Sequence, residues 1–188
     1  MKTDILAAIE QYIPRCEQEQ RDRAVMLAFM ERNADAFERS NLIAHMTTSA
    51  WVVNPGRDRV LMVYHRIYDS WSWTGGHADG ERDLLSVALR EVREETGVRS
   101  ARPVTEDIYS LEVLTVDGHK KRGEYVPSHL HMNVTYLLEA DDSEALKICE
   151  EENSGVAWFT LDGALAASTE PWFVERIYRK LNDRLKDF

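Results

Sequence analysis

Three glutamates recur at helical spacing in the segment 83–96, whose sequence is DLLSVALREVREET. Glu91 and Glu95 are four residues apart and Glu91 and Glu94 are three apart, so on a helix the three side chains are neighbours. The leucine, alanine and valine side chains of the segment form one apolar arc, which predicts packing against a sheet. Glu95 falls inside this arc, so carboxylates crowd the edge of a buried face at the C-terminal end of the helix.

Such crowding is unfavourable without a counterion, because like charges repel and the C-terminal end of a helix carries partial negative charge. Mg²⁺ and Mn²⁺ relieve it, since they prefer carboxylate oxygens and keep positions open for substrate phosphates. The plainer interpretation is a solvated face on which Arg90 and Arg93 offset the glutamates. Gly75 and Gly76, ahead of the helix, favour the cation because glycines let the backbone approach an ion or a phosphate closely.

The segment from Gly76 to Val98 resembles the Nudix box, in which a glycine, a later glutamate and the pattern R-E-U-x-E-E-x-G-U follow at fixed spacing, with U an aliphatic residue. The residues in register are Gly76, Arg90, Glu91, Val92, Glu94, Glu95, Gly97 and Val98. One position departs, because the motif calls for glutamate where this chain has Arg82. That glutamate is a supporting residue in the family, and Glu81 is the candidate to replace it. The departure therefore concerns the loop rather than the metal ligands.

The resemblance to Nudix hydrolases implies a metal-dependent enzyme that cleaves a diphosphate linkage in a nucleoside diphosphate derivative or a related substrate. It implies that Glu91, Glu94 and Glu95 carry Mg²⁺ or Mn²⁺, with the Gly75 carbonyl as a further ligand. Arg90 resembles the family arginine that orients the glutamates, and we expect it to pair with Glu94 at i,i+4 spacing. Bound cations of this kind position the diphosphate and lower the pKa of a water molecule.

The general base is not fixed within the family. The acidic run 150–152 precedes the last predicted strand and supplies three candidates, of which Glu152 is the first choice. A solvated acidic loop is the alternative.

Five residues are expected on the substrate side: Arg66, Trp73, His77, His129 and His131. Trp73 is suited to stacking on a base, with packing in the core as the alternative, and Arg66 to holding a phosphate, with simple exposure as the alternative. His129 and His131 alternate along a strand and share one of its faces. They either line the substrate cleft, bind a metal, or belong to an ordinary polar sheet face.

The period of the apolar residues changes near residue 41, from helical to strand-like. Helical patterns occupy residues 4–39, with a break at Pro14 and a second stretch from Ala24. We predict strands at 43–53, 59–67, 106–116, 127–139 and 156–159, an irregular segment at 70–80, and helices at 83–96 and 170–186. The fold class is therefore α/β (α+β), by resemblance a Nudix-like α/β/α sandwich with a mixed β-sheet. An N-terminal helical extension (1–40) precedes a Nudix hydrolase domain (41–188).

The formal net charge of −10 argues against binding to duplex nucleic acid or to a membrane surface. It does not argue against a small anionic substrate, because a local cation inverts the field inside one cleft. No apolar run approaches the about 20 residues of a membrane span. Cys16 and Cys149 have no metal-type spacing, so we expect free thiols and a cytoplasmic location. A small-molecule diphosphate is the expected partner, and a homodimer is left open.

Two other functions compete with hydrolysis. A Nudix fold that senses nucleotides without turnover is one, but all three glutamates of the box are present here. An isoprenoid diphosphate isomerase is the other. It would need a cysteine near the glycine loop, and neither cysteine lies there in the sequence.

Overall fold

Runs of strands lie between helices along the chain in the computed structural model, which describes residues 4–121, 123–150 and 153–188. Two units of structure are formed. The first unit comprises Met1–Ser49, Gly76–Val87 and Asp107–Thr135, and the second comprises Ala50–Gly75, Ala88–Glu106 and Tyr136–Phe188. Four elements run from one unit into the other: β1 (Ala44–Val53), β4 (Thr74–His77), α3 (Leu84–Thr96) and β9 (His129–Glu139).

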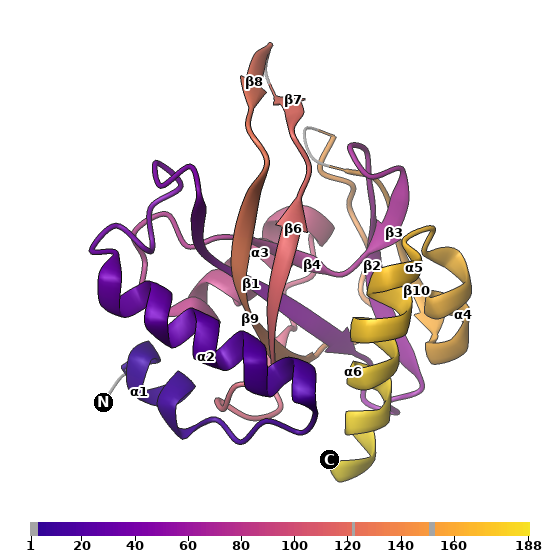
Figure 1. The fold of residues 1–188 in the computed structure, drawn as a ribbon. Helices are drawn as coiled ribbons and strands as arrows, with labels where there is room; N and C mark the ends of the chain where they lie inside the picture. Colours follow the sequence, from indigo (N-terminus) through magenta and orange to yellow (C-terminus); the bar gives the residue numbers. More distant parts are fainter. Residues whose placement is uncertain (1–3, 122, 151–152) are drawn as a thin grey trace. The chain divides into compact units, whose positions relative to one another are not determined.

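The first unit is built on a long hairpin, which two of the predicted strands, 106–116 and 127–139, form together. Its other elements are α1 (Ile5–Gln11), α2 (Glu17–Arg32), β6 (Ser110–Val116), β7 (His119–Lys121) and β8 (Glu124–Val126). Strands β6 and β9 pair antiparallel from Ser110↔Thr135 to Val116↔His129. Figure 1 shows this pair continuing into β7 and β8 at the top, with α2 crossing obliquely over β6, which it contacts. The backbone N–H of Val113 on β6 donates to the Asp22 carboxylate of α2 at 3.1 Å, which fixes the helix on the strand.

Strands β1 and β9 are parallel, which makes the sheet mixed. The Thr48 hydroxyl donates to the Val134 carbonyl at 2.9 Å, and the Leu130 N–H donates to the Ile43 carbonyl at 2.9 Å. Both sets of residue numbers increase in the same direction, whereas β6 and β9 run antiparallel. The predicted α/β class with a mixed sheet and N-terminal helices is confirmed.

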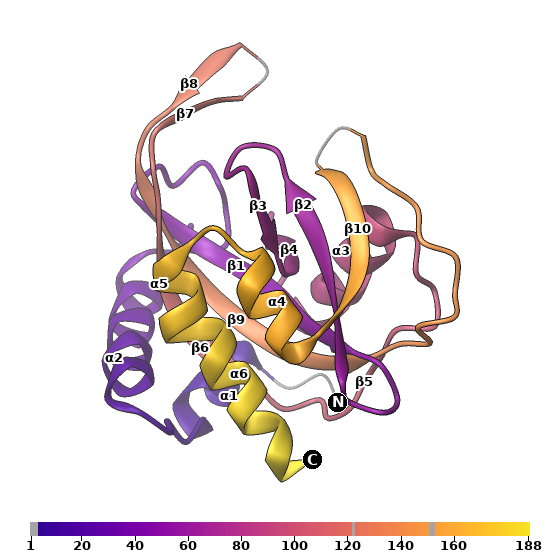
Figure 2. The ribbon, with the colours of Figure 1, turned by 90° about the vertical axis from the view of Figure 1, so that its right-hand side faces the viewer.

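The second unit orders its strands β10-β2-β1-β9-β5, with β3 paired to β2. Its remaining elements are β2 (Arg59–His65), β3 (Ser70–Ser72), β5 (Arg102–Pro103), β10 (Asn153–Thr160), α4 (Leu161–Ala167), α5 (Pro171–Phe173), a π-helix (Val174–Tyr178), α6 (Arg179–Arg184) and a final 3-10 turn (Leu185–Asp187). Its core contains the buried residues of β2 and the ring of Trp51. The Trp51 ring stacks on that of Tyr178, with 5.3 Å between the ring centroids. Figure 2 shows α4 beside β10 and β2.

Several boundaries differ from the sequence prediction. The segment 70–80 was expected to be irregular, and this was wrong, because β3 and β4 occupy most of it. Pairing of Ser72 with Val63 on β2 outweighs the local glycine and serine content. Strand β2 ends at His65 rather than at 67, and α2 begins at Glu17 rather than near Ala24. Among the described residues, no helix is long and apolar enough to cross a membrane.

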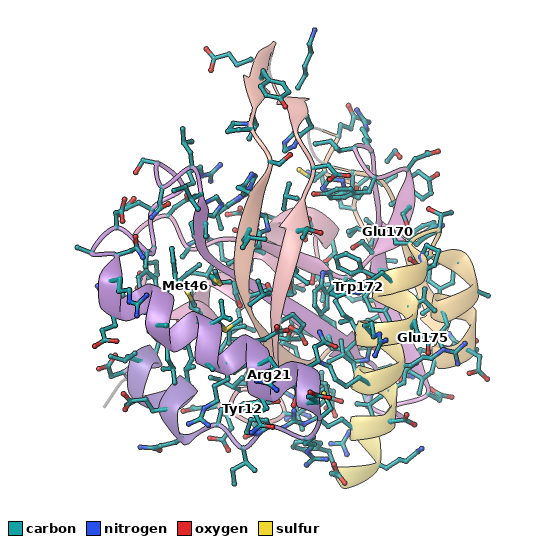
Figure 3. The ribbon with its side chains drawn as sticks, in the orientation of Figure 1. Tyr12, Arg21, Met46, Glu170, Trp172 and Glu175 are labelled. Carbon is teal, nitrogen blue, oxygen red and sulfur yellow. The ribbon has the colours of Figure 1, made fainter. Side chains whose placement is uncertain are left out.

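Glu170, labelled in Figure 3 near α5, gives a pH-dependent prediction. Burial raises the pKa of its carboxyl group above the usual 4.5, and a hydrogen bond with Ser70 partly opposes this. The folded state therefore disfavours the ionised form, so stability is present at low pH and is lost as the pH rises through the raised pKa. We expect Glu170→Gln to raise Tm at pH 7 and to leave it unchanged at pH 4. The gain should not exceed about 2–4 °C, because solvent screens a half-buried carboxylate. Calorimetry at both pH values checks this, and a larger gain at pH 4 would contradict it.

Candidate functional site

Helix α3 positions the glutamates, and both of its ends follow the sequence prediction. At its start, the Ser86 N–H donates to the Asp83 carboxylate at 3.1 Å, so Asp83 caps the helix. At its end, the Gly97 N–H donates to the Arg93 carbonyl at 2.9 Å. Gly97 has φ +76°, and a Cβ there would lie 2.8 Å from the Cβ of Lys147. Glycine is therefore required at this stop both for its backbone conformation and for space.

Glu95 lies in the buried face of α3, as the helical wheel predicted, with only 5% of the residue exposed. Its carboxylate accepts a hydrogen bond from the Gly75 N–H at 3.0 Å. Its backbone carbonyl accepts one from the side-chain amide of Asn153 at 2.9 Å. Asn153 is itself fully buried, and no motif in the sequence predicts its contact with Glu95. Because a buried carboxylate is costly without partners, these contacts fix Glu95 and bring Gly75 to it.

Glu91 and Arg90 form an ion pair, with 3.7 Å between the guanidinium and the carboxylate. The side chain of Glu91 is 15% exposed and that of Arg90 is 48% exposed, while Glu94 is exposed. The expected partner of Arg90 was Glu94, so the structure differs in the choice of carboxylate. Pairing with Glu91 places the positive charge beside the more buried of the two glutamates, where solvent screens it less.

The side chains on the last turns of α3 have the donor chemistry that suits a hard divalent cation. Glu91, Glu94 and Glu95 offer only carboxylate oxygens, and Gly75 adds a backbone segment held against Glu95. Mg²⁺ and Mn²⁺ prefer such oxygen ligands and use one or two protein carboxylates together with substrate phosphates. All four residues lie in the second unit.

The loop before α3 is organised by Arg82, at which the motif departs, and by its neighbour Glu81. The Glu81 carboxylate accepts hydrogen bonds from the N–H groups of Arg82 and Asp83, each at 2.9 Å. The Arg82 guanidinium lies over the Phe37 ring, 4.6 Å from its centroid. Glu81 thus supports the start of the helix, and Arg82 packs by a cation–π contact.

Three of the predicted substrate-side residues are histidines of the first unit. His77, His129 and His131 gather around a fourth histidine, His45, at the start of β1. Burial, together with the neighbouring histidines, lowers the pKa of His131 to about 2, and burial also lowers the pKa of His45. Among the described residues, these histidines form the one group of metal-ligating side chains with all ligand atoms within 4.8 Å of each other. The sequence prediction missed His45.

The remaining predicted residues lie elsewhere. Trp73 in the second unit is 8% exposed and makes edge-on contacts with Phe173 and Tyr178, which favours a packing role. Arg66 is exposed in the turn after β2, where a side chain can move toward a ligand. Glu152, the first choice of general base, lies outside the described residues.

The NUDIX domain family model matches residues 44–181 of the chain. The chain is 27% identical over 95 residues to the asymmetrical bis(5'-nucleosyl)-tetraphosphatase of Rattus norvegicus, a match that covers 50% of this chain and 58% of that enzyme. It is 22% identical over 145 residues to a probable DHNTP pyrophosphohydrolase of Lactococcus lactis, covering 77% of this chain and 83% of that protein.

Solved structures show the same fold at low sequence identity. The Ap4A hydrolase of C. elegans superimposes with a TM-score of 0.56 at 17% identity, over 76% of this chain and 98% of that one. A NUDIX family hydrolase from Clostridium perfringens gives a TM-score of 0.53 at 17% identity, over 73% and 96% of the two chains.

Proposed function

The chain belongs to the NUDIX domain family, and from this premise we propose that it is a hydrolase that cleaves a diphosphate linkage in a nucleotide derivative with the help of Mg²⁺ or Mn²⁺. The observation that carries the proposal is the carboxylate of Glu95, 5% exposed and held 3.0 Å from the Gly75 N–H. A buried negative charge at the negative end of a helix is stabilised best by a cation.

Each residue of the proposed site has a separate task. Glu91, Glu94 and Glu95 hold the cation, and the Gly75 backbone approaches it because no side chain intervenes. Arg90 orients Glu91 through their ion pair. When bound, the cation neutralises phosphate oxygens and lowers the pKa of an attacking water. Glu152 is retained as the proposed acceptor of the proton from that water.

The substrate class is proposed from chemistry and from the relatives. A bis(5'-nucleosyl)-tetraphosphatase and a probable DHNTP pyrophosphohydrolase are named for different organic groups, and both names specify a polyphosphate chain. Carboxylates with a divalent cation recognise that chain, whereas other parts of the protein recognise the organic group. We propose Arg66 for the substrate side, with Trp73 as the remaining candidate for contact with a base. For His129 and His131 the other predicted role, metal binding, is proposed instead, within the cluster that they form with His45 and His77.

A phosphate-release screen tests the proposal, with nucleotide and phosphomonoester products resolved by anion-exchange chromatography beside any inorganic phosphate. Nucleoside triphosphates, dinucleoside polyphosphates, nucleotide sugars, ADP-ribose, NADH and dihydroneopterin triphosphate would be incubated with the enzyme and Mg²⁺ or Mn²⁺. We expect turnover of at least one polyphosphate and none after chelation of the metal. Tight nucleotide binding without turnover of any substrate would favour the nucleotide-sensing function instead.

The same site predicts stabilisation by metal. We expect saturating Mg²⁺ or Mn²⁺ to raise Tm, because a ligand at 100 times its Kd stabilises the folded state by about 2.7 kcal/mol. Glu95→Gln should reduce this shift, since it removes a negative charge from the buried end of the site. Differential scanning calorimetry with and without metal checks both statements. A metal-induced shift that is equal in the two proteins would count against Glu95 as a ligand.

Two proposals concern the whole chain. Residues 41–188 form the hydrolase domain, supported by the family match from residue 44, and residues 1–40 form a helical extension. The free thiols of Cys16 and Cys149 support a cytoplasmic location. Light scattering of the purified protein would measure whether it is a monomer or a dimer.

A further inference from the structure

Four of the six histidines of the chain meet in the first unit. His45, His77, His129 and His131 each offer one ring nitrogen, and these atoms all lie within 4.8 Å of one another. The ring centroid of His45 is 5.1 Å from that of His77, 4.9 Å from that of His129 and 5.1 Å from that of His131. His45 thus contacts the other three rings, and His131 does the same.

The backbone holds these side chains in place from three strand ends. The Ala78 N–H donates to the Met46 carbonyl at 3.1 Å, which brings the end of β4 beside the start of β1. The Leu130 N–H donates to the Ile43 carbonyl at 2.9 Å, which brings the start of β9 to the same place. His129 and His131 alternate on β9, so both rings leave the strand on one face. The cluster is therefore fixed by sheet geometry rather than by a mobile loop.

Two of the rings are oriented as metal-binding histidines usually are. His45 Nδ1 lies 3.0 Å from the Asn41 carbonyl, and His129 Nδ1 lies 2.9 Å from the Pro127 carbonyl. A carbonyl only accepts, so Nδ1 carries the proton in each ring and Nε2 presents a lone pair. A second hydrogen bond of this kind fixes the tautomer and the orientation of metal-ligating histidines.

The two lone pairs so presented differ in their partners: that of His129 meets only a neighbouring histidine of the cluster, and that of His45 meets none among the described residues. His45 is 4% exposed, so its unpaired Nε2 is buried. His129 Nε2 faces His131 Nε2 at 3.1 Å. In a tetrahedral zinc site with bonds of 2.0–2.1 Å, ligand nitrogens are separated by about 3.3 Å. The His129–His131 spacing is already close to that value, and the remaining nitrogens need only a modest contraction.

We propose that His45, His77, His129 and His131 form a binding site for a divalent transition-metal ion, with Zn²⁺ as the ion that fits best. Neutral imidazoles suit zinc, whereas the carboxylates of α3 suit Mg²⁺ and Mn²⁺, so the two sets of residues select different metals. Four protein ligands leave no open position, which is the arrangement of a structural zinc site. The bound ion would tie β1, β4 and β9 together within the first unit.

Zinc affinity in excess Mg²⁺ tests this site separately from the carboxylates of α3. With Mg²⁺ occupying the carboxylates, competition against a chromophoric chelator should show one equivalent of Zn²⁺ bound by the wild-type protein. His129→Gln and His131→Gln should each weaken binding by more than about 100-fold, since even loss of an outer-shell partner costs 10- to 100-fold. His65→Gln is the matched control, because His65 lies in the second unit beside Tyr68 and should bind zinc as the wild type does.

X-ray absorption of the zinc-loaded wild-type protein gives a second test that needs no variant. We expect a first shell of nitrogen at about 2.0–2.1 Å with the outer scattering of imidazole rings. An oxygen-only shell would overturn the proposal, as would zinc binding that is unchanged in both histidine variants. Neither outcome depends on whether the protein hydrolyses a nucleotide with Mg²⁺, so failure of the proposed function would be recognised independently.

Discussion

Replacement of Glu95 by glutamine is expected to lower kcat/KM by about 10²- to 10³-fold for the best substrate found in the phosphate-release screen. The substitution keeps the side-chain volume and one acceptor for the Gly75 N–H, but it removes a negative charge from a residue that is 5% exposed. A cation that is bound less tightly stabilises the transition state by several kcal/mol less. Each 1.4 kcal/mol changes the rate about tenfold. Initial rates at saturating Mg²⁺ give the value.

Two further variants make the measurement specific. Glu91→Gln should lower kcat/KM by a similar factor, because Glu91 lies one helical turn away on the same face. Glu175→Gln is the control, since Glu175, labelled in Figure 3, is exposed and pairs with Arg179 at 3.5 Å. Rates for Glu95→Gln within twofold of the wild type would remove Glu95 from the site, while the family membership would stand.

The carboxylate helix was predictable because its signals are local. The apolar period of 83–96, the cap at Asp83 and the stop at Gly97 lie within a few residues of the bonds they make. The burial of Glu95 followed from the same period. The hairpin of β6 and β9 was predictable too, since each strand is long and rich in β-branched and apolar residues.

Features that depend on distant partners were not predictable in this way. Strand β3 exists because Ser72 pairs with Val63, and its own composition favours a loop. His45 joins the histidine cluster only because β1 and β9 are parallel neighbours, and nothing beside it in the sequence marks it out. Asn153 reaches the Glu95 carbonyl across 58 residues of sequence. In each case tertiary pairing decides the outcome over local propensity.

The beginning of α2 was misjudged for a related reason. Residues 17–23 are almost all charged or polar, so the sequence pattern places the apolar face later. Glu19 nevertheless is fully buried, with its carboxylate accepting from the Arg15 N–H at 2.8 Å and the Ser110 hydroxyl at 3.0 Å. A buried polar residue with partners cannot be told from a solvated one by periodicity. The contact also shows that α2 is built into the first unit rather than merely attached to it.

Replacement of Glu112 by alanine is expected to lower the free energy of unfolding by about 3–5 kcal/mol. Glu112 on β6 is fully buried and accepts from the Asn133 amide at 3.2 Å and the Thr135 hydroxyl at 2.8 Å, and it shares the single proton of the Ser110 hydroxyl with Glu19. Each buried group left without a partner costs about 1–3 kcal/mol. Urea unfolding followed by circular dichroism measures the change, and a loss below about 1 kcal/mol would contradict the assigned network.

The control variant keeps the shape and changes only the charge. Glu112→Gln retains one accepting oxygen and should lose less stability than Glu112→Ala. Because Ser110 contacts both Glu112 and Glu19, the effects of Glu112→Ala and Glu19→Ala should not add, and a double-mutant cycle should give a coupling of at least about 0.5 kcal/mol. Strict additivity would mean that α2 and the β6–β9 pair are stabilised independently. Coupling would instead show that the N-terminal helices and the hairpin that bears His129 and His131 form one cooperative structure.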